Sequence, residues 1–225
     1  MRLRWLRSLA PVRAISGNID TGAAVHRETI RTVAFSDGVF AITVTLLVLE
    51  IRPPTDEDLL QGLVDLWPSY LTYAVTFMFI GQVWANHHVM FDHIRAADRA
   101  ILLLNTVLLM VVAFLPFATS VLAEALRSGH GQPTAVVFYG AAFALTALMF
   151  NGVWQYARRQ RLIQEALDPV GATAIGRRFQ FAVAWLAIGA LLGALVPALG
   201  VVVIAAFNVV YWLPIRGESP QPQPS

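Results

Sequence analysis

Residues 31–50, RTVAFSDGVFAITVTLLVLE, constrain this chain most, because they place charges in a stretch that is otherwise apolar enough to cross a bilayer. A spanning helix needs roughly 20 predominantly apolar residues, which this segment supplies. Its charged residues are Arg31, Asp37 and Glu50. An ionised side chain near the centre of a membrane helix costs about 2.5–3.5 kcal/mol on insertion scales and usually faces protein or water. We therefore expect a membrane helix with a polar anchor.

The helical spacing separates this anchor from an apolar face. At about 100° per residue, one face carries Phe35, Val39, Ile42, Leu46 and Leu49, flanked by Gly38 and Thr45. Asp37 points nearly the opposite way. The segment thus predicts a helix with one smooth apolar face that carries a single hydroxyl, and with a polar back that is buried among other helices.

Composition places the whole chain in the membrane class. The 225 residues are 57% hydrophobic and 13% charged, whereas soluble domains carry about 25% charged residues. Cysteine is absent, which excludes a disulfide framework, a thiol nucleophile and a thiolate metal site. All 16 basic residues are Arg. They cluster beside apolar segments, which is typical of membrane topology signals rather than of nucleic-acid binding.

Hydropathy predicts an all-α membrane protein with six transmembrane helices. We expect them at residues 30–51, 67–90, 99–124 and 134–157, and as two short helices within 178–213. Pro116 predicts a kink in the third span, because proline removes a backbone donor. The residues from Val196 to Gly200, VPALG, predict a tight turn between the last two helices. A single long tilted helix with a re-entrant end is the alternative.

Arginine alternates between successive loops. The N-terminal arm and the 91–99 and 158–178 loops carry Arg, whereas the 52–66 loop has four acidic residues against one Arg. Because cytoplasmic loops are enriched in Arg, we expect a multi-pass protein of the cell membrane with both termini in the cytoplasm. The expected domains are a basic cytoplasmic arm (1–29), a six-helix transmembrane domain (30–213) and a Pro-rich, disordered tail (214–225).

The run R-x-x-x-F-S-D-G-V-F-A-I-x-x-T-L-L-V-L-E at residues 31–50 closely resembles the first membrane helix of the transmembrane protein 175 family. That family comprises the endosomal and lysosomal potassium channel and its single-repeat prokaryotic relatives. The pattern Arg31…Phe35-Ser36-Asp37 is similar to the family hallmark. Further matches are Trp84-x-x-His87, Asn105 and the pair Pro116-Phe117.

The resemblance implies a structural network of hydrogen bonds among the matching polar residues. Its expected members are Arg31, Phe35, Ser36, Asp37, Trp84, His87 and Asn105. Without the resemblance, His87 is an interfacial histidine and Asn105 is a residue that packs helices together by a hydrogen bond. The topology independently places the first helix's polar residues and His87 at the same membrane depth.

The resemblance also implies a pore. Single-repeat members are homotetramers in which the first helix of each subunit lines the pore, with isoleucine and leucine rings as the constriction. The matching residues are Ile42, Leu46 and Leu49, and Thr45 can offer its hydroxyl to a partly dehydrated cation. Narrow apolar rings gate ions by dewetting. The chain contains no TVGYG sequence, so a conventional potassium-selectivity filter is excluded.

The expected function is therefore a potassium-permeable cation channel in the lipid bilayer, with K⁺ as the permeating ion. A proton-conducting channel is an alternative, since Asp37, His87 and His88 can titrate. A secondary transporter is a further alternative. Such a protein needs charges near the middle of the membrane or broken helices, and spans four to six lack acidic residues. No enzyme motif, metal-ligand set or cofactor motif appears, and we expect no nucleic-acid partner. Glu50 is either a solvated helix end or part of a carboxylate ring at the pore mouth.

Overall fold

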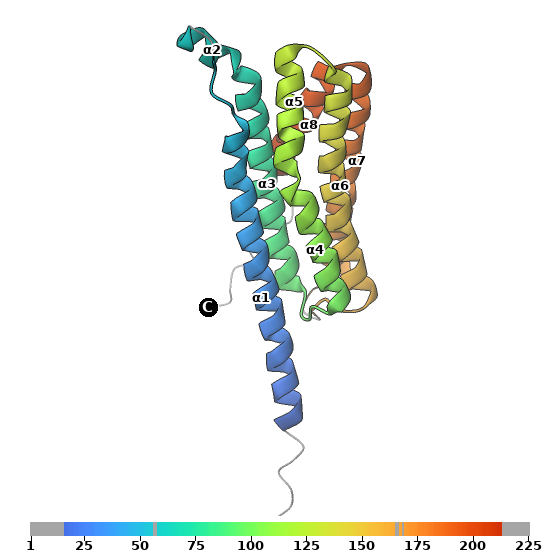
Figure 1. The fold of residues 1–225 in the computed structure, drawn as a ribbon. Coiled ribbons are helices and arrows are strands. Elements are labelled where there is room, and N and C mark those ends of the chain that lie inside the picture. Colours follow the sequence, from blue (N-terminus) through green and yellow to red (C-terminus); the bar gives the residue numbers. More distant parts are fainter. Residues whose placement is uncertain (1–15, 56–57, 165–166, 168, 213–225) are drawn as a thin grey trace, which may run out of the picture.

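The first helix, α1 (Ser16–Leu46), is the longest element and lies at the edge of a helical bundle (Figure 1). The computed structural model describes residues 16–55, 58–164, 167 and 169–212. The 31 residues of α1 rise about 46 Å and continue into one 3₁₀ turn, η1 (Leu47–Glu50). The helix begins inside the segment predicted as a separate arm, so residue 30 is not a structural boundary. Residues 1–15 and the predicted tail lie outside the described residues.

Seven further helices follow, and the described part of the chain contains no strand. They are α2 (Leu59–Asp65), α3 (Trp67–His93), α4 (Arg99–Ala113), α5 (Leu115–Ser128), α6 (Gln132–Arg159), α7 (Pro169–Leu195) and α8 (Pro197–Trp212). The long helices run roughly side by side, with α3 next to α1, while α2 leans out at one end of the bundle (Figure 1).

Local chemistry explains where these helices begin and end. Asp98 caps α4, because its carboxylate accepts from the backbone N–H of Ile101 at 2.8 Å. Tyr156 on α6 donates to the same carboxylate at 2.9 Å. The turn from α5 to α6 contains Gly129 and Gly131, with φ of 75° and 67°. Only glycine adopts this left-handed backbone readily.

Among the described residues, four helical segments are long and apolar enough to cross a membrane, and five are if the bent pair α2–α3, with its angle of 44°, counts as one span. The six predicted spans are thus found only in part. The predicted turn near Val196 is present, and two helices flank it. The last of them, α8, has 16 residues. It rises about 24 Å, less than the roughly 30 Å of a hydrocarbon core. The predicted kink at Pro116 coincides with a break between α4 and α5 at Phe114.

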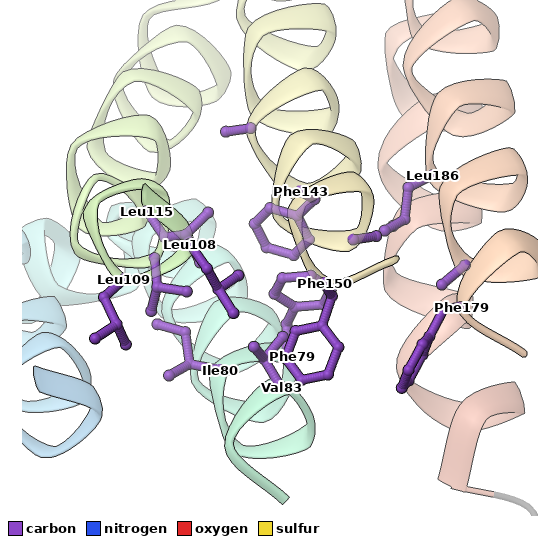
Figure 2. Packing of buried hydrophobic residues seen from close by; sticks show 14 of the residues in the cluster. Phe79, Ile80, Val83, Leu108, Leu109, Leu115, Phe143, Phe150, Phe179 and Leu186 are labelled. Carbon is purple, nitrogen blue, oxygen red and sulfur yellow. The ribbon is translucent and has the colours of Figure 1, made fainter. Parts of the chain in front are cut away.

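The buried hydrophobic core has members on all the long helices, and aromatic rings from α3, α6 and α7 belong to it (Figure 2). Phe79 stacks on Phe143 with ring centroids 3.9 Å apart, and Phe150 meets Phe179 edge to face at 5.1 Å. Figure 2 also shows Leu186 of α7 facing this group. The core therefore connects the later helices, and α1 packs against this group through α3 and α4.

Candidate functional site

The two faces of α1 have opposite environments. Ser36, Phe40, Thr43 and Leu47 form a buried row, with at most 3% of each residue exposed. Phe35, Ile42, Leu46 and Leu49 lie on the other side and are 42–71% exposed. Because α1 lies at the edge of the bundle (Figure 1), no helix of the described chain covers this second row. A single chain therefore presents an uncovered apolar stripe along α1.

One position, Val39, differs from the predicted apolar face. Val39 is half-buried and packs against the core instead of lying in the exposed row. Thr45 is exposed as expected, and its hydroxyl donates to the carbonyl oxygen of Ile42 at 2.8 Å. The oxygen of Thr45 keeps its lone pairs free for another donor or a cation.

A buried hydrogen-bonded chain fixes the back of α1. The amide nitrogen of Asn105 donates to the hydroxyl oxygen of Ser36 at 3.0 Å, and that hydroxyl donates to the carbonyl of Thr32 at 2.8 Å. The other end of the Asn105 amide, Oδ1, lies 2.9 Å from Nε2 of His87. Since a carbonyl oxygen only accepts, Nε2 carries the hydrogen. The chain thus connects α3, α4 and α1.

Aromatic rings hold His87 in this orientation. Its ring stacks on Phe91 with centroids 4.4 Å apart and meets the edge of Phe40 at 5.4 Å. The residue is fully buried, and its Nδ1 has no hydrogen-bond partner among the described residues. The orientation of the imidazole is therefore set by packing on one side and by Asn105 on the other.

Asp37 and Trp84 form a second link between α1 and α3. The indole Nε1 of Trp84 donates to Oδ1 of Asp37 at 2.9 Å. This pair is partly exposed in the single chain, unlike the Ser36–Asn105–His87 chain. The two links attach α1 at neighbouring positions on different sides of its axis, which resists rotation of the helix.

Arg31 and Phe35 lie outside both links. Arg31 is exposed and makes no ion pair with Asp37 among the described residues. Six residues advance a helix by about 600°, so Arg31 and Asp37 lie about 120° apart around α1. Phe35 is 61% exposed and belongs to the apolar stripe. The expected seven-member network is therefore found as two separate links built from Ser36, Asp37, Trp84, His87 and Asn105.

Glu50 ends η1 beside an open groove of about 1470 Å³. The groove also contains Arg52, Asp65, Glu124 and Arg127. Glu124 and Arg127 pair with each other at 2.7 Å. Glu50 is half-buried in this setting, so it is neither fully solvated nor enclosed in the single chain.

The structure adds polar contacts that the sequence did not predict. Thr76 of α3 contacts Thr119 of α5 at 2.9 Å and Tyr139 of α6 at 2.8 Å through hydroxyl oxygens, and all three residues are buried. Gln82 of α3 donates to the backbone of Asn208 on α8 at 2.7 Å. A single hydroxyl or amide side chain inside an apolar span indicates that the residue forms a hydrogen bond to another helix. The sequence does not show which residue is its partner.

Comparison with known proteins gives a consistent set of matches. The family described as the endosomal/lysosomal potassium channel TMEM175 matches residues 31–116. A potassium channel of Streptomyces collinus is 40% identical over 156 residues, covering 68% of this chain and 76% of that protein. The endosomal/lysosomal proton channel TMEM175 of Danio rerio is 32% identical over 172 residues, covering 64% of this chain and 32% of that protein.

A solved structure supports the same likeness. The crystal structure of a lysosomal potassium-selective channel TMEM175 homologue from Chamaesiphon minutus superposes with a TM-score of 0.75 at 36% identity. The superposition covers 82% of this chain and 96% of that chain. The likeness therefore extends through most of the bundle, beyond the segment that carries the sequence motifs.

Proposed function

This chain belongs to the TMEM175 family, and from this premise we propose that it forms a potassium-permeable cation channel. It is a membrane protein of an ion-channel family rather than of an enzyme family. The single observation that carries the proposal is the uncovered apolar stripe of α1, opposite a buried polar anchor. The relatives that are named potassium channels give K⁺ as the permeating ion.

The anchor orients the stripe. A hydrogen bond between membrane helices contributes about 0.6–2 kcal/mol, and the links through Ser36 and Asp37 lie on different sides of α1. Together they favour one rotation of α1 about its axis. In that rotation the row of Ile42, Leu46 and Leu49 points away from its own bundle. When several copies of the chain assemble around a common axis, this row of each copy faces that axis.

Symmetric copies of the row form stacked apolar rings. Cyclic symmetry closes such an arrangement, and we propose a homotetramer with α1 of each subunit around the pore. Rings of Ile42, Leu46 and Leu49 restrict ions by dewetting. Thr45 supplies the hydroxyl oxygen between these layers. Glu50, at the end of the same helix, then lies near the mouth of the pore.

Polar substitution of the constriction tests the pore. Ile42→Asn and Leu46→Asn should each raise K⁺ flux into liposomes and weaken discrimination against Na⁺, because water then wets the rings. A barrier lowered by about 1.4 kcal/mol raises the flux roughly tenfold. Ile188→Asn, at an exposed position of α7, is the matched control and should leave the flux unchanged. Unchanged flux in both α1 variants, with assembly intact, would show that α1 does not line the path. A secondary transporter would instead lose flux when its helix is altered.

Proton conduction is the second candidate. Relatives in animals are named proton channels, and His87 lies in a continuous hydrogen-bonded chain with Asn105 and Ser36. Flux measured under separate K⁺ and H⁺ gradients distinguishes the two functions. A current that follows only the H⁺ gradient would replace the potassium proposal. A K⁺ current that rises when Ile42 or Leu46 is replaced by Asn supports the potassium proposal.

A further inference from the structure

The side-chain amide of Gln82 has a defined orientation inside the membrane-spanning bundle. Its nitrogen Nε2 donates to the backbone carbonyl of Asn208 at 2.7 Å. Because a carbonyl oxygen only accepts, the amide cannot be turned over without losing this bond. Its oxygen Oε1 is therefore directed elsewhere. Gln82 is 3% exposed, and Oε1 has no hydrogen-bond partner among the described residues.

Gln82 also lines a small cavity. It has a volume of about 30 Å³ and lies between α3, α6, α7 and α8. Five of its eleven lining residues are aromatic, among them Phe79, Phe150 and Phe179, which Figure 2 shows approaching one another from three helices. None of its lining residues belongs to α1, so the cavity is separate from the proposed pore.

The surface of the cavity is mostly apolar, with a few polar side chains in its lining. Besides Gln82, the lining includes Asn86, Thr146 and Tyr211. Thr146 donates to the carbonyl of Ala142 at 2.9 Å, so its oxygen is left to accept. Tyr211 lies 3.3 Å from the amide oxygen of Asn86, to which it donates. A buried water usually makes two to four hydrogen bonds and needs roughly 10–15 Å³.

We propose that this cavity is a binding site for ordered water, held by Oε1 of Gln82. One water donates to Oε1 and uses Thr146 or Asn86 as its further partner, and the volume admits a second water. Among the described residues, no carboxylate lines the cavity. A purely apolar occupant leaves Oε1 unsatisfied in the membrane interior, which is costly. With Thr146 as the second partner, the bound water joins α3 to α6 within each subunit.

The test is a high-resolution cryo-electron microscopy map of the full chain in lipid nanodiscs, compared with two variants. We expect a compact density peak within hydrogen-bond distance of Oε1 in the unaltered protein. The peak should disappear in Gln82→Leu. It should remain in Gln155→Leu, a half-buried glutamine of α6 that does not line the cavity.

Thr146→Val provides a second variant, since Gln82→Leu also removes the bond to Asn208 and can impair folding. This change keeps the shape of residue 146 and the Gln82–Asn208 bond, and the peak should weaken or move. A map that resolves ordered water elsewhere but shows no peak here would overturn the proposal. So would a peak that persists in Gln82→Leu, or elongated density of an acyl chain in the cavity. Liposome flux is measured separately, so failure of the water site leaves the channel proposal untouched.

Discussion

Asn105 uses both ends of its side-chain amide to connect three helices. It donates to Ser36 on α1 and accepts from His87 on α3, while its own backbone belongs to α4. Both partners are fully buried. Asn105 thus makes one of the two hydrogen-bonded links that attach α1 to the bundle, and this link is buried.

Removing this amide should destabilise the protein. Asn105→Leu leaves the Nε2–H of His87 without an acceptor, and a buried unsatisfied group costs about 1–3 kcal/mol. We expect a lower melting temperature in detergent, measured by size-exclusion chromatography after heating. Asn151→Leu, at a half-buried position of α6, is the matched control and should change the melting temperature less. Equal melting temperatures for both variants would contradict the role of Asn105.

Asp37 should tolerate Asn better than Ala. Its contact with Trp84 is a hydrogen bond to the carboxylate, and Arg31 does not pair with it among the described residues. Asp37→Asn keeps an acceptor oxygen, whereas Asp37→Ala removes a charge-assisted bond of about 1.5–3 kcal/mol. We expect Asp37→Ala to lower the yield of assembled protein in detergent, and Asp37→Asn to restore most of it. Equal losses in both variants would indicate that the charge itself is required.

At the scale of elements, glycines allow α6, α7 and α8 to pack closely. A Cβ atom at Gly200 would collide with the backbone of Gly193, and one at Gly193 would collide with the side chain of Val136. The two helices of the α7–α8 hairpin therefore touch through their backbones. This contact depends on residues without side chains.

Alanine at these positions should be destabilising. Overpacking costs about 1–3 kcal/mol, and we expect Gly200→Ala and Gly193→Ala to lower the melting temperature. A Cβ at Gly152 of α6 meets nothing within 4 Å. Gly152→Ala should therefore be neutral or stabilising, because alanine favours a helix by about 1 kcal/mol over glycine. A stabilising effect of Gly200→Ala would show that α7 and α8 are farther apart than described.

At the scale of the whole molecule, the exposed stripe of α1 leaves the single chain incomplete as a pore. The bundle of α3 to α8 contacts α1 on one side only (Figure 1). Any path lined by Ile42, Leu46 and Leu49 requires walls from other copies. Assembly is therefore the property on which the proposed function depends most directly.

The absence of cysteine permits a direct test of assembly. A single Leu46→Cys substitution should form disulfides between copies under mild oxidation, seen as a dimer band on a denaturing gel. Leu191→Cys, on the exposed face of α7, is the control and should give little dimer. The unaltered protein should elute as a tetramer in mild detergent. Monomeric protein with intact ion flux would refute the shared pore.

Contiguous residues were enough to predict the long apolar helices, although not their number or all their ends, because length, hydropathy and proline position are local properties. The long spans and the α7–α8 turn near Val196 follow from them. Family membership followed from the motif around Ser36 and Asp37. The tertiary structure alone decided the partners: Asp37 bonds Trp84 rather than Arg31, and Gln82 bonds Asn208 across 126 positions. Such choices depend on how each helix is rotated and docked against the others, which no local pattern specifies.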